Sequence, residues 1–276
     1  MAKTPEKLEQ LIIQLTKISE SLSVEETSQL PPPRAKKVRT TITEAYNKLR
    51  KVIEGLDPIK HPGFVFDPSN PDVAGRVIGI SMIAQSPKPL DNIQRFYGSG
   101  VYALYYHGNF PPYAGVSKRE HPIYVGKADP ARPASNTAME QGDQLAKRLS
   151  EHRKTIMKAK STLHSEDFSY RALVVKNGYQ SSAEEYLIRL FDPLWNSVCK
   201  GFGKHGDDPD TRSNQRSPWD TLHPGRDWAH RDAKMKDAKS PDRIVSEIDT
   251  HLAKYPPLRT VDEILRKFLL EMRDIS

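Results

Sequence analysis

Cysteine is almost absent from this chain of 276 residues, in which Cys199 is the only one. A single cysteine excludes an intrachain disulfide and any zinc site built from several cysteines. The sequence has no run of about 18 or more apolar residues, so we expect no transmembrane helix. The first residues lack the apolar core of a signal peptide. These absences predict a protein of a reducing cytoplasm.

Positive charge is in modest excess, because 42 lysines and arginines face 35 aspartates and glutamates, for a formal net charge of +7. Such an excess favours a polyanionic partner. Many basic proteins never bind nucleic acid, so the charge alone does not decide. At 37% hydrophobic residues the chain can bury a core.

Residues 1–58 predict a helical hairpin, because apolar residues recur at alternating spacings of three and four in two runs. The runs are Leu8, Leu11, Leu15, Ile18 and Leu22, then Val38, Ile42, Tyr46, Leu49 and Ile53. Prolines 31–33 separate them, and basic residues follow at 34–39. The basic segment is either a solvated turn or a contact to DNA phosphates. The hairpin itself is expected to embrace DNA or to join subunits.

The rest of the chain is predicted to be an α+β protein. A connecting segment at 59–97 contains a short apolar run, Val77–Ile83, that we interpret as a strand. A core at 98–200 follows, and a loop and helix extension at 201–276 closes the chain. The core is expected to hold a three-stranded antiparallel sheet flanked by helices. Its predicted strands are 100–106, 123–126 and 168–176, and its predicted helices are 139–160 and 181–191.

Six polar residues stand at conspicuous places on these elements. Two are strand tyrosines, two lie four residues apart on one helix face, one begins a later helix, and one follows Pro193-Leu194-Trp195. They are Tyr102, Tyr124, Arg148, His152, Glu184 and Asn196. Each also has a structural explanation: core tyrosines, a surface ion pair of Arg148 with Glu151, a solvated histidine, a capping acid and a helix end. Glu185 is the rival of Glu184.

Together with Gly100-Val101-Tyr102 and Tyr124-Val125-Gly126, these residues resemble the GIY-YIG nuclease superfamily over residues 98–197. The run Tyr124–Lys127, the Arg-xxx-His pair and the segment 216–226 resemble its type II restriction branch. The stretch between the two tyrosines is longer than usual in that family. We interpret residues 107–121 as an inserted loop.

The resemblance implies a prokaryotic, sequence-specific restriction endonuclease that cleaves double-stranded DNA at a short palindromic site. The supply of arginines is consistent with a GC-rich site similar to CCGCGG. A palindrome implies a homodimer, or a higher oligomer, with one active site per strand. One alternative is a GIY-YIG nuclease of DNA repair or of mobile elements. Another is a basic DNA-binding protein whose nuclease core is inactive.

The resemblance also implies a role for each residue. Glu184 would hold one Mg²⁺ per active site, which suits a hard cation that keeps most of its waters. Tyr102 would be the general base, with His152 as its partner or as the base itself. Arg148 would neutralise the scissile phosphate. Three further residues would bind phosphate, orient the site or add charge: Tyr124, Asn196 and Lys127.

Base reading in the major groove uses Arg or Lys on guanine and Asn or Gln on adenine. The stretch 200–231 is rich in such groups and is our first candidate for DNA recognition, although a solvated surface extension has the same composition. Its candidates are Lys204, Arg212, Asn214, Gln215, Arg216, His223 and Arg226. The loop 107–121, with Lys118 and Arg119, is the second candidate.

Overall fold

The computed structural model describes residues 6–21, 30–56, 59, 65–203, 215–229 and 235–273. By its internal contacts the chain divides into two units, Met1–Gly63 and Phe64–Ser276. The two units are treated separately below.

The first unit contains two helices, α1 (Glu6–Ser21) and α3 (Pro32–Leu56). Both were predicted from apolar periodicity, and α3 begins within the proline run because proline is tolerated in the first turn of a helix. Among their described residues none is buried. Leu22, the last member of the first apolar run, lies outside the described residues.

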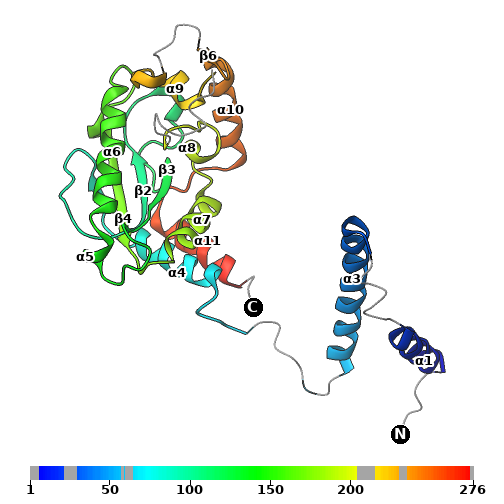
Figure 1. Ribbon diagram of the computed structural model, residues 1–276. Helices are drawn as coiled ribbons and strands as arrows, with labels where there is room; N and C mark the ends of the chain where they lie inside the picture. Colours follow the sequence, from blue (N-terminus) through cyan, green and yellow to red (C-terminus); the bar gives the residue numbers. More distant parts are fainter. Residues whose placement is uncertain are drawn as a thin grey trace. The chain divides into compact units, whose positions relative to one another are not determined.

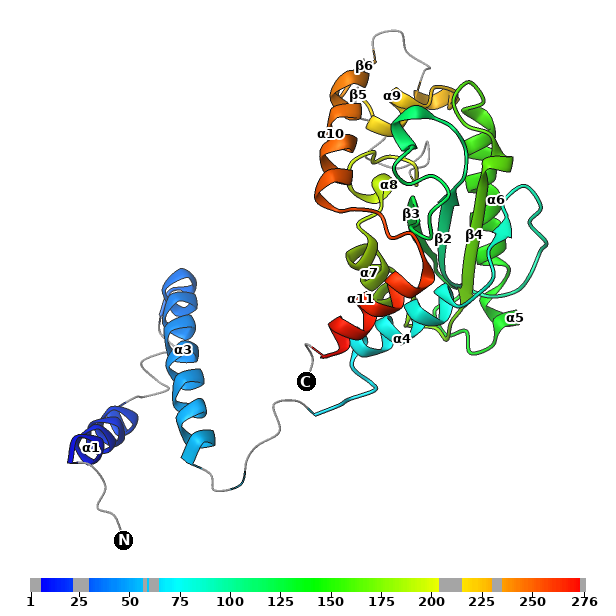
Figure 2. The same ribbon diagram turned by 180° about the vertical axis from the view of Figure 1, so that it is seen from behind.

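The second unit is built around one central sheet, with helices packed on both of its faces (Figures 1 and 2). The strands of its central sheet and its main helices are, in chain order, α4 (Pro71–Ile83), β1 (Lys88–Pro89), β2 (Gly100–Tyr106), β3 (Tyr124–Ala128), α6 (Gln144–Lys158), β4 (Phe168–Val174), α7 (Gln180–Phe191), α10 (Pro241–Lys254) and α11 (Val261–Arg273). Short pieces lie between them: η1 (Pro111–Tyr113), α5 (Ala138–Gln141), η2 (Ser165–Asp167), α8 (Leu194–Ser197), β5 (Gln215–Arg216), α9 (Pro218–Leu222), η4 (Asp227–Ala229) and β6 (Lys236–Asp237).

The central sheet has the strand order β1-β4-β2-β3, and every neighbouring pair is antiparallel. The predicted α+β class is confirmed, but the sheet has four strands, not three. The additional strand is Lys88–Pro89, which pairs with Ser169 and Tyr170 of β4. A two-residue strand has no periodicity of its own, so the sequence could not reveal it.

Strand β2 lies in the middle of the sheet, and all seven of its residues are buried. Its side chains alternate between two cores, as the period of a strand requires. Tyr102 and Leu104 pack with α6, α8 and α9 on one face. Val101, Ala103 and Tyr105 pack against α4, α7 and α11 on the other. Figure 1 shows α6 beside the sheet, with α4, α7 and α11 grouped on the opposite side.

Val77–Ile83, which we interpreted as a strand, belongs to helix α4 instead. The side chain of Asn70 accepts a hydrogen bond from Asp72 N, and Pro71 occupies the first helical position, so the helix start is capped. Gly79, Met82 and Ile83 are buried at the helical spacing of three and four residues, and Met82 and Ile83 pack with residues of α7. A short apolar run does not distinguish strand from helix, and here the capping signal decides.

The C-terminal part of the chain returns to the sheet on both faces. Ile244 and Ile248 of α10 join the core that contains Tyr102, whereas Ile264 of α11 joins the core that contains Tyr105. Within the described residues, no helix is both long enough and apolar enough to cross a bilayer.

Candidate active site

A groove of about 400 Å³ opens at the end of the sheet where β2 and β3 meet α6 and α7. Four of the six candidates line it: Tyr102, Tyr124, Arg148 and Glu184. They come from β2, β3, α6 and α7, so the fold gathers residues that lie far apart in the sequence. Further residues on its wall were not predicted, namely Ala128, Asp129, Gln144, Lys147 and Glu151. Gln144 and Arg148 are four apart on α6, a helical spacing that could have revealed Gln144.

Tyr102 and His152 form a buried pair behind the groove. The phenol oxygen lies 2.6 Å from Nε2 of His152, and the two rings are 5.3 Å apart. Tyr102 is fully buried and His152 is 2% exposed. Burial raises the pKa of Tyr102 well above 10, the nearby Tyr124 adds to this, and Arg148 opposes it. The phenol is therefore protonated, and it donates to Nε2 when the imidazole carries its own proton on Nδ1.

The glycine of the second tyrosine motif makes room for this phenol. Gly126 lies directly opposite Tyr102 in the pairing of β2 with β3. A Cβ at Gly126 would sit 2.4 Å from the Tyr102 hydroxyl oxygen. The motif therefore needs glycine for space, because any larger residue would displace the phenol that reaches His152.

Glu184 is the fifth residue of α7, in its second turn, and lines the groove. Burial raises the pKa of its carboxyl group, while Lys127 opposes that rise. The ionised form is thus incompletely compensated by the protein, which is the electrostatic condition that favours an added cation. Its rival Glu185 is exposed and does not line the groove.

Arg148 reaches across the groove from α6. Its Nη1 lies 3.1 Å from Oε2 of Glu151, and its Nη2 donates to the carbonyl oxygen of Gly203 at 2.9 Å. The side chain is 23% exposed. The guanidinium is therefore held at the groove and remains accessible to a ligand.

Asn196 and Lys127 support the groove from its sides. The Asn196 side chain accepts from Val125 N and donates to Val125 O, both at 2.9 Å. It thus fixes the backbone of β3 next to Tyr124. Lys127 bonds to both carboxylate oxygens of Asp129 at 3.1 Å and to Ser181 Oγ at 3.0 Å, so its ammonium lies at the rim near Glu184.

The predicted DNA-reading residues fall into three groups. Lys204, Arg212 and Asn214 lie outside the described residues. Lys118, Gln215 and Arg119 are exposed or half-buried, as is Arg216, whose Nε bonds to Asp237 at 2.6 Å. These four are accessible. None of them lines the groove.

His223 and Arg226 are in the interior, contrary to a role at the DNA surface. His223 is fully buried, and its ring nitrogens contact the hydroxyls of Tyr113 at 2.6 Å and Thr162 at 2.8 Å. Arg226 is 3% exposed and forms an ion pair with Asp220. Both side chains already have protein partners, so they serve the fold of the extension and we withdraw them as base-reading candidates.

The model of the Eco29kI GIY-YIG domain family matches residues 94–252, more than half of the chain. The chain belongs to this family. The family is one of restriction endonucleases, so the chain is a nuclease that binds DNA. A search among curated proteins finds no match.

The match to the Eco29kI family extends well beyond the groove. It includes the inserted loop at 107–121, α9 and most of α10. The extension that packs behind the sheet is therefore part of the family domain.

Proposed function

We propose that this protein is a type II restriction endonuclease in which Tyr102 and His152 act as a proton relay and Glu184 holds one Mg²⁺. The single observation that supports this most is the 2.6 Å contact between Tyr102 and His152 at the back of a groove that also presents Arg148 and Glu184. Each group needed for phosphodiester hydrolysis has a candidate there.

In the proposed relay, Tyr102 and His152 would share the work of the general base. A phenol with a raised pKa is a poor base while it keeps its proton. Here Tyr102 would pass its proton to Nε2 of His152 as it takes one from the attacking water. The water oxygen bonds to phosphorus, the bond from phosphorus to the 3′-oxygen breaks, and the leaving oxygen takes a proton from solvent. His152 ends the step as an imidazolium and then returns its proton to solvent.

Positively charged side chains in the groove would stabilise the negative charge that develops on the phosphate. The Arg148 guanidinium can bind two phosphate oxygens and stays protonated throughout. Tyr124 lies beside it in the same groove, with its ring 6.2 Å from that of Tyr102, and can donate to the phosphate. Lys127 adds charge from the rim.

The donor set in the groove fits one hard divalent cation. Glu184 supplies a carboxylate, and no cluster of three or more potential ligands occurs in the described parts of the chain. Mg²⁺ commonly binds through one or two carboxylates and keeps several waters. When bound, it would stabilise the charge of the pentavalent phosphate.

The target we propose is a short palindrome in double-stranded DNA, cut by a homodimer with one groove per strand. Two chains related by a two-fold axis match the symmetry of such a site. The accessible residues Lys118, Arg119, Gln215 and Arg216 are the described candidates for DNA contacts. Guanine is the base that arginine reads best, which favours a GC-rich site.

The proposal is tested by digesting plasmid and genomic DNA with the full-length chain in Mg²⁺ or in EDTA. We expect metal-dependent cleavage into discrete fragments whose sequenced ends share one palindrome. Scattered ends would indicate a repair or mobile-element nuclease instead. Absence of cleavage with DNA binding retained would indicate a DNA-binding protein without catalysis.

Glu184→Gln and Glu185→Gln provide a matched pair, because the two carboxylates are neighbours on α7. We expect Glu184→Gln to lower the cleavage rate by about 10³-fold while DNA binding persists. Glu185→Gln is expected to cleave like the wild type. Wild-type turnover by Glu184→Gln would overturn the assignment of the metal ligand.

A further inference from the structure

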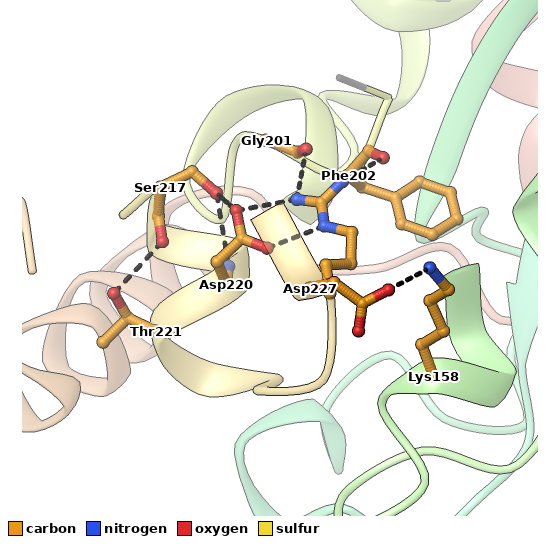
Figure 3. Close-up of polar contacts among 8 residues, drawn as sticks. Lys158, Gly201, Phe202, Ser217, Asp220, Thr221 and Asp227 are labelled. Carbon is orange, nitrogen blue, oxygen red and sulfur yellow. Dashed lines mark hydrogen bonds and ion pairs between the residues drawn. The ribbon is translucent and has the colours of Figure 1, made fainter. Parts of the chain in front are cut away.

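We propose that the buried ion pair of Arg226 with Asp220 is a positioning device for the active site. It would fix the segment Gly201–Gly203, which in turn holds the side chains of His152 and Arg148. The inference rests on the proposed function, because it assigns a support to two residues with proposed roles. Figure 3 shows Asp220, Gly201 and Phe202 converging on one guanidinium group.

The ion pair is bidentate and almost completely removed from solvent. Arg226 Nε and Nη2 donate to the two carboxylate oxygens of Asp220, each at 2.7 Å. The side chains of Arg226 and Asp220 are 4% and 0% exposed. The central carbon of the guanidinium also lies 4.7 Å from the ring centroid of Trp219 and 4.6 Å from that of Trp228. A planar cation held by this fork and by two aromatic rings has little freedom to change its orientation.

Two further N–H donors of this guanidinium bind backbone carbonyls of the segment beside the active site. Nη2 donates to Gly201 O at 2.9 Å and Nη1 donates to Phe202 O at 3.2 Å. Both bonds are charge-assisted, which makes them stronger than ordinary backbone bonds. Arg226 therefore fixes two successive carbonyls of a turn.

The fixed turn places Phe202 against the imidazole of the proposed relay. The Phe202 and His152 rings are stacked 4.6 Å apart with 20° between their planes. Phe202 also meets Tyr124 edge-on at 5.1 Å. The stacked ring restricts the tilt of the imidazole, and the position of Nε2 relative to Tyr102 depends on that tilt.

The next residue contacts the arginine of the groove. Gly203 O accepts from Arg148 Nη2 at 2.9 Å, which turns the guanidinium toward the groove. A Cβ at Gly203 would lie 2.6 Å from the Tyr124 hydroxyl oxygen, so the backbone packs against Tyr124 with no room for a side chain. Three consecutive residues thus transmit the orientation of Arg226 to His152, Tyr124 and Arg148.

Arg171 offers a matched control on the opposite face of the sheet. It is 5% exposed, pairs with Glu120 at 2.8 Å, donates to Gln85 O at 2.7 Å and lies over the ring of Tyr105 at 4.7 Å. It is thus a second buried, stacked and ion-paired arginine that also holds a backbone carbonyl. None of these partners lines the groove.

The experiment compares Arg226→Lys with Arg171→Lys in the full chain. Lysine keeps the charge and loses the planar fork. Three quantities are measured for each: the single-turnover cleavage rate, the Kd for the same DNA in Ca²⁺, and the ¹H–¹⁵N NMR shifts of the His152 imidazole. We expect Arg226→Lys to lower the rate by about 10- to 100-fold with unchanged Kd and to move the His152 signals. Arg171→Lys is expected to leave the rate and those signals at wild-type values.

Phe202→Leu tests the same device without disturbing the ion pair, because leucine keeps the apolar character and removes the stacked ring. We expect it to slow cleavage and to move the His152 signals, again with unchanged Kd. Wild-type rates in Arg226→Lys or in Phe202→Leu would overturn the inference. So would an equal loss in Arg171→Lys, or failure of both Arg226→Lys and Phe202→Leu to fold, because the contacts would then be purely structural.

The outcomes for this inference and for the proposed function are separable. If the wild-type chain does not cleave DNA in Mg²⁺, the proposed function fails before any variant is compared. If the wild type cleaves, Glu184→Gln does not, and Arg226→Lys cleaves normally, only the positioning role fails.

Discussion

The two faces of the central sheet are built from alternate residues of the same strand, yet they differ in chemistry. Tyr102 faces α6 and contacts His152 behind the groove. Its neighbours Val101 and Ala103 face α7 and α4 and are surrounded by apolar side chains. One face therefore combines a core with the proposed reaction site, while the other serves packing. Alternation along β2 assigns each residue to one of these tasks.

The comparison also explains how α7, which packs on the apolar face, would contribute a residue to the proposed active site. Leu187 and Leu190 of this helix are buried in the apolar core. Glu184 lies near the N-terminal end of α7, in its second turn, and lines the groove. A well-packed helix thus places one carboxylate in the groove, beside side chains from β2, β3 and α6.

The largest contrast between the faces is expected from two tyrosines of β2. Tyr102→Phe removes the hydroxyl of the relay, so the cleavage rate should fall by about 10³-fold. Tyr105 lies three residues later on the opposite face, where burial raises its pKa to about 12. Tyr105→Phe should cleave at the wild-type rate. Single-turnover assays at saturating enzyme measure both, and equal rates in the two variants would contradict the division of faces.

A smaller contrast is expected from two arginines. Arg148→Lys keeps a charge at the groove and loses the bidentate fork, so we expect a rate loss of about 10²-fold. Arg189 on α7 is 57% exposed and pairs with Asp72 at 3.6 Å, away from the groove. Arg189→Lys should leave the rate unchanged. A comparable loss in both would mean that net charge, and not position, governs the rate.

Two glycines sharpen the comparison further. Gly126→Ala would push the Tyr102 hydroxyl away from His152 and should slow cleavage by about 10-fold. Gly79→Ala on α4 would instead meet the Tyr186 ring at 2.9 Å on the apolar face. It should cost about 1–3 kcal/mol of stability without slowing the native enzyme. Thermal unfolding and cleavage rates, measured on the same samples, separate the two effects.

The smallest effect concerns the stability of the protein in acid. Each face of the sheet has one buried histidine that affects it. Burial lowers the pKa of His223 to about 3 and that of His121 to about 4, below the ordinary value of 6.5. Both are neutral when folded and take up protons on unfolding. Their contribution to the free energy of unfolding is therefore complete above pH 6.5. It is lost as the pH falls through the pKa values that the two histidines have in the folded protein.

We expect Tm to fall between pH 6.5 and pH 4, and either His121→Gln or His223→Gln to reduce that slope. The two single variants should do so to a similar degree, because each removes one proton uptake. An unchanged dependence of Tm on pH in both variants would mean that other groups control the stability in acid.

Sequence patterns predicted the parts of the fold that repeat a local rule. The apolar strand at 100–106, the amphipathic helix containing Arg148 and the helix that ends before Asp192-Pro193 all have such patterns. Strand Lys88–Pro89 has none, since its pairing depends on β4 alone. Val77–Ile83 was assigned to the wrong element because the apolar run was read without the cap at Asn70.

In the site, the tyrosine, arginine, histidine and glutamate positions were predictable because they recur in a known motif. Arg226 and His223 were misread because a basic residue in a polar segment looks the same whether it meets DNA or a buried aspartate. The pairing of Arg226 with Asp220 depends on how 201–228 folds back on itself. Local spacing does not encode that.

The most direct test of the central claim is a titration of Mn²⁺ into the protein bound to uncleavable DNA, followed by electron paramagnetic resonance. We predict one tightly bound ion per chain in the wild type and in Glu185→Gln, and at least about a tenfold weaker affinity in Glu184→Gln. Equal Mn²⁺ affinity in all three proteins would contradict the claim that Glu184 holds the metal ion in this groove.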